Sequence, residues 1–211
     1  AAGINYTLCF AQGTGSVTNT QGNIAWTSAE PPKQTAPLDF DQRHKVSFNF
    51  DYSLLENEGP TWGNMRPFAN TSVNVLYNVG SGTPYTSTNV YNEVTLANVN
   101  PTPNAPLNSK YGPWTSALDL KASKGFRVGG SHMEAFVWAL NVLDTQNPVQ
   151  VYTSSGAHDV VGFLNTEPGR EYLQTAAAAG KDGEGLYHLA ENNPVVVANP
   201  RLVRFGIRAS F

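Results

Sequence analysis

The sequence predicts an all-β fold: an antiparallel, up-and-down transmembrane β-barrel segment of about six strands, an incomplete barrel. Three observations lead to this fold class: strands in which apolar and polar residues alternate, connections that alternate between long and short, and the lack of a long apolar run. In the clearest strand, residues 201–211, Val203 and Phe205 alternate with Arg204 and Arg208. Because successive side chains of a strand point to opposite faces, this strand has one apolar and one polar face.

Five further segments share this alternation. In residues 43–54, for example, Val46 and Phe48 alternate with Ser47 and Asn49. A strand of about ten residues, apolar outside and polar inside, is what a transmembrane barrel requires. The predicted strands span residues 3–12, 43–54, 69–80, 115–128, 132–145 and 201–211.

Composition excludes several other classes. Only 14% of the residues are charged and the net charge is −3, so nucleic acid is not an expected partner. No run approaches the roughly eighteen apolar residues of a transmembrane helix, which leaves a barrel as the membrane option. Cys9 is the only cysteine, so a disulfide framework or a thiolate metal cluster is not expected. We find no nucleophile–base–acid set and no phosphate-binding glycine loop, and therefore expect neither an enzyme nor a cofactor.

The lengths of the connections predict the topology. Residues 13–42, 81–114 and 146–200 form long connections, whereas residues 55–68 and 129–131 form short ones. Barrels of the outer membrane have long extracellular loops and short periplasmic turns. The long connections are therefore expected outside the cell.

The short turn 129–131 also predicts which side chains face lipid. A three-residue turn places Phe126 opposite Glu134, and in residues 132–145 it assigns Phe136, Trp138 and Leu140 to the lipid face. Lys124 and Glu134 then lie on that face near the turn. There a charge reaches the interface at a cost of roughly 0–1 kcal/mol. A bulge at Gly125 that turns Lys124 inward is the alternative.

Several segments resemble motifs of TonB-dependent outer-membrane receptors. Pro37-Leu38-Asp39-Phe40-Asp41-Gln42-Arg43-His44 is similar to their LDxDQRH motif. Residues 118–126 and 134–144 resemble the penultimate hairpin of these receptors, and residues 199–211 resemble their C-terminal strand. Residues 82–86, Gly-Thr-Pro-Tyr-Thr, resemble the SGxPyt segment of the Oar-like branch.

The resemblance implies more than the periodicity does. Such receptors have a twenty-two-stranded barrel, an N-terminal plug domain and a TonB box, and they take up scarce or large ligands such as siderophores, cobalamin, glycans or peptides. We identify no plug domain and no TonB box here, so residues 1–211 are expected to be the C-terminal portion of a receptor barrel in the outer membrane of a Gram-negative bacterium. The implied partners are the rest of the barrel and the plug, the TonB complex, the outer-membrane assembly machinery and the lipid bilayer.

Three sets of residues are candidates for function. The polar residues expected to face the lumen are Asp51, Asp119, Lys121, Arg127, Asn141, Arg204 and Arg208. The aromatic residues of the long loops are expected to contact ligand: Trp26, Tyr85, Tyr91, Tyr111, Tyr152, Phe163, Tyr172 and Tyr187. They stand in loops rich in Asn, Thr, Gly and Pro, which are expected to lack a packed core. Phe205, Ile207 and Phe211 resemble the C-terminal signal read by the assembly machinery.

Metal binding is the weaker hypothesis for the residues that precede the second strand. Asp39, Asp41 and His44 carry ligand groups, but their spacing matches no established metal geometry and favours a structural motif at the barrel rim.

In the last loop, residues 168–179 have helix formers and predict a short helix. Asp182 and Glu184 lack the ligand ladder of a calcium loop, so residues 180–185 are expected to form a flexible turn.

Two other functions remain open at this stage. The chain could belong to a different outer-membrane barrel, either a porin or an assembly whose chains each contribute strands. It could also be a soluble β-sandwich that binds a ligand, because short alternating runs occur in sandwiches too. A sandwich would be a secreted fragment that stays soluble without detergent, and its outer face should not consist of Phe, Val and Leu throughout.

Overall fold

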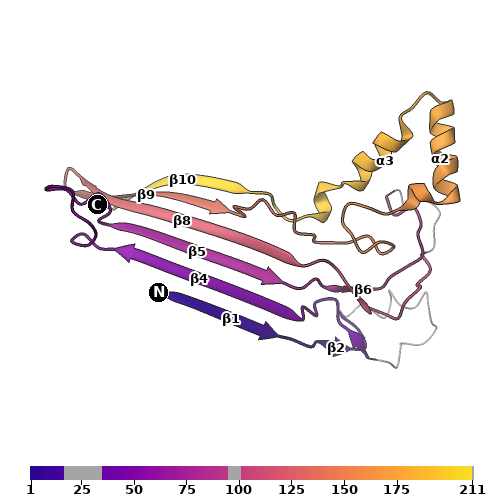
Figure 1. Ribbon diagram of the computed structural model, residues 1–211, viewed down its shortest axis with the longest axis horizontal. Coiled ribbons are helices and arrows are strands. Elements are labelled where there is room, and N and C mark those ends of the chain that lie inside the picture. Colours follow the sequence, from indigo (N-terminus) through magenta and orange to yellow (C-terminus); the bar gives the residue numbers. More distant parts are fainter. Residues whose placement is uncertain (17–34, 95–100, 211) are drawn as a thin grey trace.

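The computed structural model describes residues 1–16, 35–94 and 101–210. Its main element is an antiparallel sheet of six strands whose order in space follows the chain, β1-β4-β5-β8-β9-β10 (Figure 1). These strands are β1 (Ala2–Leu8), β4 (His44–Leu54), β5 (Thr71–Gly80), β8 (Thr115–Val128), β9 (Ser131–Leu140) and β10 (Leu202–Ser210). The all-β class and the antiparallel, up-and-down order are confirmed. The strand bounds lie within two residues of those predicted, except that β1 ends at Leu8 rather than at residue 12 and β9 ends at Leu140 rather than at residue 145.

The connections divide between the two ends of the sheet. The described parts of the three long ones lie at one end, the loop end, together with the helices and small sheets of the described residues (Figure 1). The short connection 55–70 and the turn 129–130 lie at the other, the turn end (Figure 1). The small sheets pair β2 (Gln12–Gly13) with β3 (Ala36–Pro37) and β6 (Pro84–Tyr85) with β7 (Lys110–Tyr111). The helical segments are η1 (Phe163–Asn165), α2 (Glu167–Ala178), α3 (Gly183–Glu191) and η2 (Pro194–Val196).

The register places apolar residues of neighbouring strands on a common face. Phe48 of β4, for example, lies opposite Ile4 of β1 and Tyr77 of β5. Directly opposed residues of an antiparallel pair project to the same side, so each pairing carries the face to the next strand. The apolar face includes Ile4, Tyr6, Val46, Phe48, Phe50, Val73, Val75, Tyr77, Leu118, Leu120, Val137, Val203, Phe205 and Ile207.

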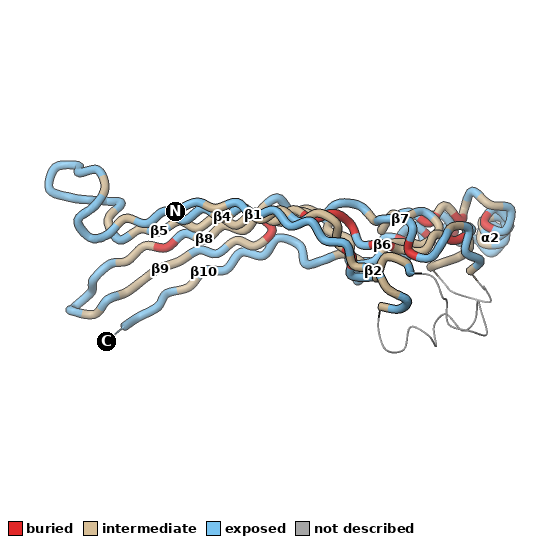
Figure 2. Tube along the Cα trace, turned by 90° about the horizontal axis from the view of Figure 1, so that it is seen from below, coloured by how far each residue is buried: buried red, intermediate tan, exposed pale blue. Residues whose placement is uncertain are grey.

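No second layer of described residues covers this face. Ile4 is 72% exposed and Phe205 is 77% exposed, and Figure 2 shows the six strands as a single curved layer. The buried apolar residues of the described segments are Val161, Phe163 and Tyr187, which all belong to the connection between β9 and β10. In the parts of the chain that the structure describes, no helix is long and apolar enough to cross a membrane.

The turn between β8 and β9 differs from the three-residue turn predicted. Val128 lies opposite Ser131, so the turn consists of Gly129 and Gly130 alone. Both have positive φ, 57° and 91°, as type I′ turns require. Since a shift of one residue moves every side chain of a strand to the other face, the predicted faces of β9 are wrong.

The corrected register changes the surroundings of several side chains. Phe126 faces Met133 rather than Glu134. Phe136, Trp138 and Leu140 belong to the polar face, and Met133, Ala135, Val137 and Ala139 belong to the apolar face. Glu134 also lies on the polar face, where its carboxylate accepts a hydrogen bond from Arg208 at 3.3 Å.

Lys124 stays on the apolar face, as predicted, without a bulge. The pairing of β8 with β9 runs unbroken through Lys124 and Gly125, so the bulge alternative is wrong. The ammonium group donates to the carbonyl oxygens of Pro67, at 2.8 Å, and Ala69 in the connection 55–70. The long side chain therefore carries its charge toward the turn end.

The turn makes a prediction about stability. Replacing Gly129 with Val is expected to destabilise the folded protein by about 1–2 kcal/mol, because a β-branched residue is strained at positive φ. Gly129→Asn is the matched control, since asparagine tolerates this conformation and should cost far less. Equilibrium unfolding of both variants checks this, and equal losses would contradict the two-residue turn.

Candidate functional site

Residues 37–44, the rim motif, join the strand ends at the loop end of the sheet. The amide of Leu38 donates to the carbonyl of Ala11 at 3.0 Å, just beyond β1. The Gln42 side chain donates to the carbonyl of Ser81 at 3.0 Å, and the amide of His44 donates to the Ser81 hydroxyl at 3.1 Å. The motif thus connects the ends of β1, β4 and β5.

A buried carboxylate lies at the centre of the rim motif. Asp41 is fully buried. Its oxygens accept hydrogen bonds from the Ala11 amide at 2.9 Å, from Arg43 Nε at 2.8 Å and from the Tyr111 hydroxyl at 2.8 Å. The Arg43 guanidinium in turn lies over the rings of Phe10, at 4.5 Å, and Tyr111, at 5.3 Å.

These contacts keep Asp41 ionised. Burial by itself raises the pKa of Asp41, but the three hydrogen bonds and the charge of Arg43 outweigh it and hold the pKa below its ordinary value. The same contacts raise the pKa of Arg43. A paired, hydrogen-bonded carboxylate of this kind fixes geometry rather than performing proton transfer.

The other two residues of the metal hypothesis have separate partners. His44 stacks between Tyr6 and Trp114, with centroids 6.1 and 5.9 Å away, and its Nδ1 lies 2.8 Å from the Tyr6 hydroxyl. Asp39 accepts a hydrogen bond from the Asn108 side chain at 2.7 Å. Within the described residues, no three His, Cys, Asp or Glu side chains form a group that could hold a metal ion. The geometry fits a structural role for the rim motif.

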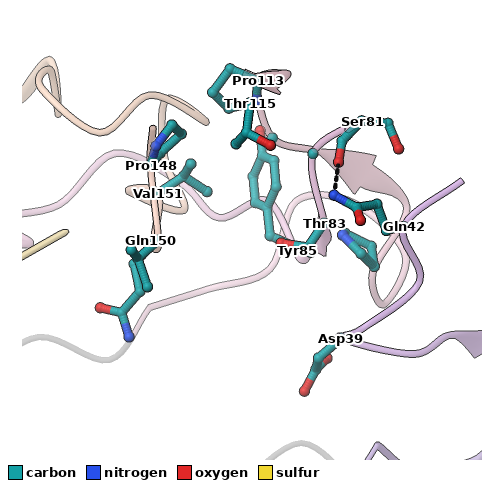
Figure 3. Close-up of a pocket in the computed structure, with 14 residues that line it drawn as sticks. Asp39, Gln42, Ser81, Thr83, Tyr85, Pro113, Thr115, Pro148, Gln150 and Val151 are labelled. Carbon is teal, nitrogen blue, oxygen red and sulfur yellow. Dashed lines mark hydrogen bonds between the residues drawn. The ribbon is translucent and has the colours of Figure 1, made fainter. Parts of the chain in front are cut away.

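A cavity of about 600 Å³ adjoins the rim motif (Figure 3). Tyr85 of β6 lines it, together with uncharged polar side chains and the single acid Asp39. A second hollow of about 330 Å³ shares Gln42 and Thr115 with it and continues to Lys45 on the polar face. Further lining residues of the cavity include Thr83, Pro148 and Gln150.

Gly82, in the segment that resembles SGxPyt, stands at a position that requires glycine. A Cβ at this position would lie 2.1 Å from the Gly112 carbonyl oxygen and 2.8 Å from that of Pro113. Only glycine permits this approach of two backbone segments. The amide of Gly112 also donates to the Thr83 carbonyl at 3.0 Å. The segment therefore forms one wall of the cavity.

The loop aromatic residues have different surroundings from one another. Tyr85 lines the cavity, Tyr111 packs within the rim motif, and Tyr91 is half-buried. Trp26 lies outside the described residues. Burial raises the pKa of Tyr85, which keeps its hydroxyl neutral and available for hydrogen bonds.

The last loop has a packed core, so the expectation that the loops lack one is wrong there. Phe163 stacks on Tyr187 with centroids 5.6 Å apart, and Tyr172 meets Tyr187 edge-on at 6.1 Å. Tyr152 packs against this core and donates to the Glu191 carbonyl at 2.7 Å. Burial raises the pKa of Tyr187, whose hydroxyl has no hydrogen-bond partner among the described residues. These side chains hold the loop together, and Tyr187 is too buried for direct contact with ligand.

Two helices lie on this core. The predicted helix 168–179 is confirmed as α2, shifted by one residue, with the Thr166 side chain as its N-cap. The flexible turn predicted for residues 180–185 is wrong, because Asp182 caps a second helix, α3, by accepting from the Gly185 amide at 2.9 Å. An aspartate at the N-cap was the available signal, and the glycines that follow it obscured the helix.

Most of the expected lumen residues lie on the polar face with specific partners. Asp51 accepts a hydrogen bond from the Asn74 side chain. Arg127 pairs with Glu56 at 3.1 Å, and Arg208 pairs with Glu134. Asp119 accepts a backbone amide at 2.9 Å, whereas Lys121 and Arg204 lie against the rings of Phe136 and Trp138.

Asn141 is a correction. The predicted strand 132–145 ends at Leu140, and Asn141 turns the chain with φ 49°. Its side chain bonds to the backbone of Thr145, at 3.0 and 3.1 Å, and to the Asn199 carbonyl at 3.3 Å. Asn141 therefore closes a turn just beyond the end of β9.

The C-terminal strand carries the apolar residues of the proposed assembly signal. Phe205 and Ile207 lie exposed on the apolar face, and Phe211 lies outside the described residues.

Comparison of the chain with models of protein families, with curated proteins and with solved structures found no match. The site is therefore interpreted from its own residues and geometry.

The rim motif makes a prediction about pH dependence. Asp41→Asn is expected to cost about 2–3 kcal/mol at neutral pH, because it weakens the bonds of a buried carboxylate. Since the folded-state pKa of Asp41 is lowered, this stabilisation exists above the ordinary pKa and disappears as the pH falls through the folded value. The difference in melting temperature between the wild type and Asp41→Asn should therefore shrink below about pH 4.

Asp39→Asn is the control for this prediction. Asp39 is exposed, and its loss should change stability less. A difference for Asp41→Asn that stays constant down to pH 3 would contradict the role of the ionised carboxylate.

Proposed function

We propose that the chain is part of the barrel wall of a TonB-dependent receptor in the outer membrane of a bacterium, a transporter for a scarce or large ligand such as a siderophore, cobalamin, a glycan or a peptide. The observation that carries the proposal is the exposed apolar face, which continues across all six strands. A face of this size is unstable in water and stable in lipid, because hydrocarbon surface is driven out of water.

The same observation weighs against a soluble β-sandwich. A sandwich buries its apolar faces between two sheets about 10 Å apart. Here the two small sheets of the described residues have two strands each and lie at the loop end, away from the apolar face (Figure 1). This arrangement leaves the apolar face free to contact lipid.

The distribution of connections supports an outer-membrane barrel. The described parts of the long connections lie at one end and both short connections at the other (Figure 1). This matches barrels with long extracellular loops and short periplasmic turns. In that orientation the loop end faces the outside and Lys124 lies toward the periplasm.

The sheet edges support a larger assembly. Along the described strands, β1 pairs only with β4, and β10 pairs only with β9. An open edge in lipid would leave a row of unsatisfied backbone groups. Further strands are needed, either from the same polypeptide or, as in a multi-chain barrel, from other chains. The rim motif favours a receptor over a porin, because it combines the resemblance with a specific structural role.

Spin labels test the placement in lipid. In the complete receptor, with Cys9 replaced by Ser and reconstituted in vesicles, single labels at 133–138 should alternate. Oxygen, which enters the bilayer, should relax labels at Met133, Ala135 and Val137. A water-soluble nickel complex should relax labels at Glu134 and Trp138, because these share the polar face.

Phe205 and Arg204 of β10 supply the matched pair of controls. Oxygen should relax a label at Phe205, and the nickel complex should relax a label at Arg204. If the labels of neither strand alternate, a lipid-facing wall is contradicted. If in β9 alone oxygen relaxes the labels at Glu134 and Trp138 and nickel relaxes those at Met133, Ala135 and Val137, the two-residue turn is contradicted.

Binding to TonB tests the transporter class. The complete receptor in detergent should bind the purified periplasmic domain of TonB from the same bacterium, and deletion of the receptor segment before the plug should abolish binding. Surface plasmon resonance measures both. If the labels alternate between oxygen and nickel but the complete protein does not bind TonB, the porin or multi-chain alternative is favoured.

A further inference from the structure

A row of three side chains crosses β8, β9 and β10 on the polar face. Trp138 lies directly opposite Lys121 on one side and Arg204 on the other. Adjacent strands lie about 4.8 Å apart, so the backbones of Lys121 and Arg204 are about 10 Å apart. Trp138 is two residues from the end of β9 at the loop end, and Arg204 is two residues from the start of β10 there.

Both cations lie against aromatic rings rather than carboxylates. Arg204 Cζ is 5.6 Å from the centroid of the Trp138 ring, and Lys121 Nζ is 5.8 Å from that of Phe136. Among the described residues, neither cation has a carboxylate oxygen within 4.0 Å. An aromatic face holds a cation in place without cancelling its charge.

Two other cations of these strands do have carboxylate partners. On the same face, Arg208 pairs with Glu134 at 3.3 Å, and Arg127 pairs with Glu56 at 3.1 Å. Asp119, two residues before Lys121, accepts the backbone amide that follows β9 at 2.9 Å. Four cations of β8 and β10 were expected to line a lumen. Two of them, Arg127 and Arg208, are paired with carboxylates, whereas Lys121 and Arg204 are not.

Gly206 allows the support of Lys121. A Cβ at Gly206 would lie 2.4 Å from Phe136 Cζ, so only glycine lets this ring lie against β10. In that place the ring is within reach of the Lys121 ammonium. The sequence thus supplies a small residue, two rings and two cations at neighbouring positions.

We propose that Lys121 and Arg204, held by Phe136 and Trp138, form a binding site for a small anionic ligand that carries carboxylate or phosphate groups. Two unpaired like charges in one row create a local positive potential that an anion relieves. Charge-assisted hydrogen bonds from the ammonium and guanidinium groups then hold the anion. The inference deepens the proposed function and rests on it for the place of the site, on the lumen wall near the mouth, where it would favour anionic ligands.

Calorimetric titration of the complete receptor in detergent tests the site, with citrate as the carboxylate probe and pyrophosphate as the phosphate probe. Arg204→Gln and Lys121→Gln should each weaken binding about tenfold, because each removes one charge-assisted contact. Added salt should weaken binding to the wild type. Arg208→Gln, on the same strand and face, is the matched control and should change affinity less than twofold.

The outcomes separate the sources of the anion. Binding of citrate alone assigns carboxylates, and binding of pyrophosphate alone assigns phosphates. The site is overturned if neither probe binds or if Arg208→Gln weakens binding as much as the other two. If neither probe binds and both Arg204→Gln and Lys121→Gln lower the melting temperature more than Arg208→Gln does, the row instead binds an acidic protein segment.

Failure of the site and failure of the proposed function give different results. Labels in β9 that alternate between oxygen and nickel, in a receptor that binds neither probe, would remove only the anion site. Labels that show no alternation would remove the membrane wall itself, whatever the titration gives.

Discussion

The hydrogen-bond register of the six strands is the constraint on which the rest of the structure depends. Each pairing is continuous over its length, so the apolar set of one strand faces the apolar set of the next from β1 to β10. A slip of one residue in a strand would move its side chains to the opposite face, so the apolar face would no longer be continuous. Because no described layer covers the apolar face, cross-strand contacts and the surroundings of the sheet must stabilise it.

The loop end solves a different problem, which is to hold long connections without a large apolar core. Asp41 does so through polar contacts: one buried carboxylate fixes the chain after β1, the start of β4 and the β6–β7 hairpin through Tyr111. The last loop instead packs a few aromatic residues beneath α2 and α3. A polar centre and a small core together keep a cavity open between the connections, which a continuous hydrophobic core would fill.

The sequence was sufficient for the strands and insufficient for the loops, for physical reasons. Alternation with a period of two over about ten residues is typical of a strand and incompatible with the 3.6-residue period of a helix. The strand positions were therefore predicted to within a few residues, apart from the early end of β9 at Leu140. The core around Tyr187 joins residues far apart in the chain, and no local pattern encodes such contacts. The partners of Asp39, Asp41 and His44 were hidden for the same reason, since Asn108, Tyr111 and Tyr6 come from other segments.

The faces of β9 show where alternation itself becomes ambiguous. Met133, Ala135, Val137 and Ala139 are apolar, but so are Phe136, Trp138 and Leu140, so hydrophobicity alone cannot choose between the faces. Two local features decide it. The Gly-Gly pair favours a two-residue turn, and Gly206 of β10 leaves room for a large ring directly opposite it. Aromatic residues on a polar face therefore have a physical reason here, because they support Lys121 and Arg204. Within the described residues these two cations have no carboxylate partner, whereas Arg127 and Arg208 each have one.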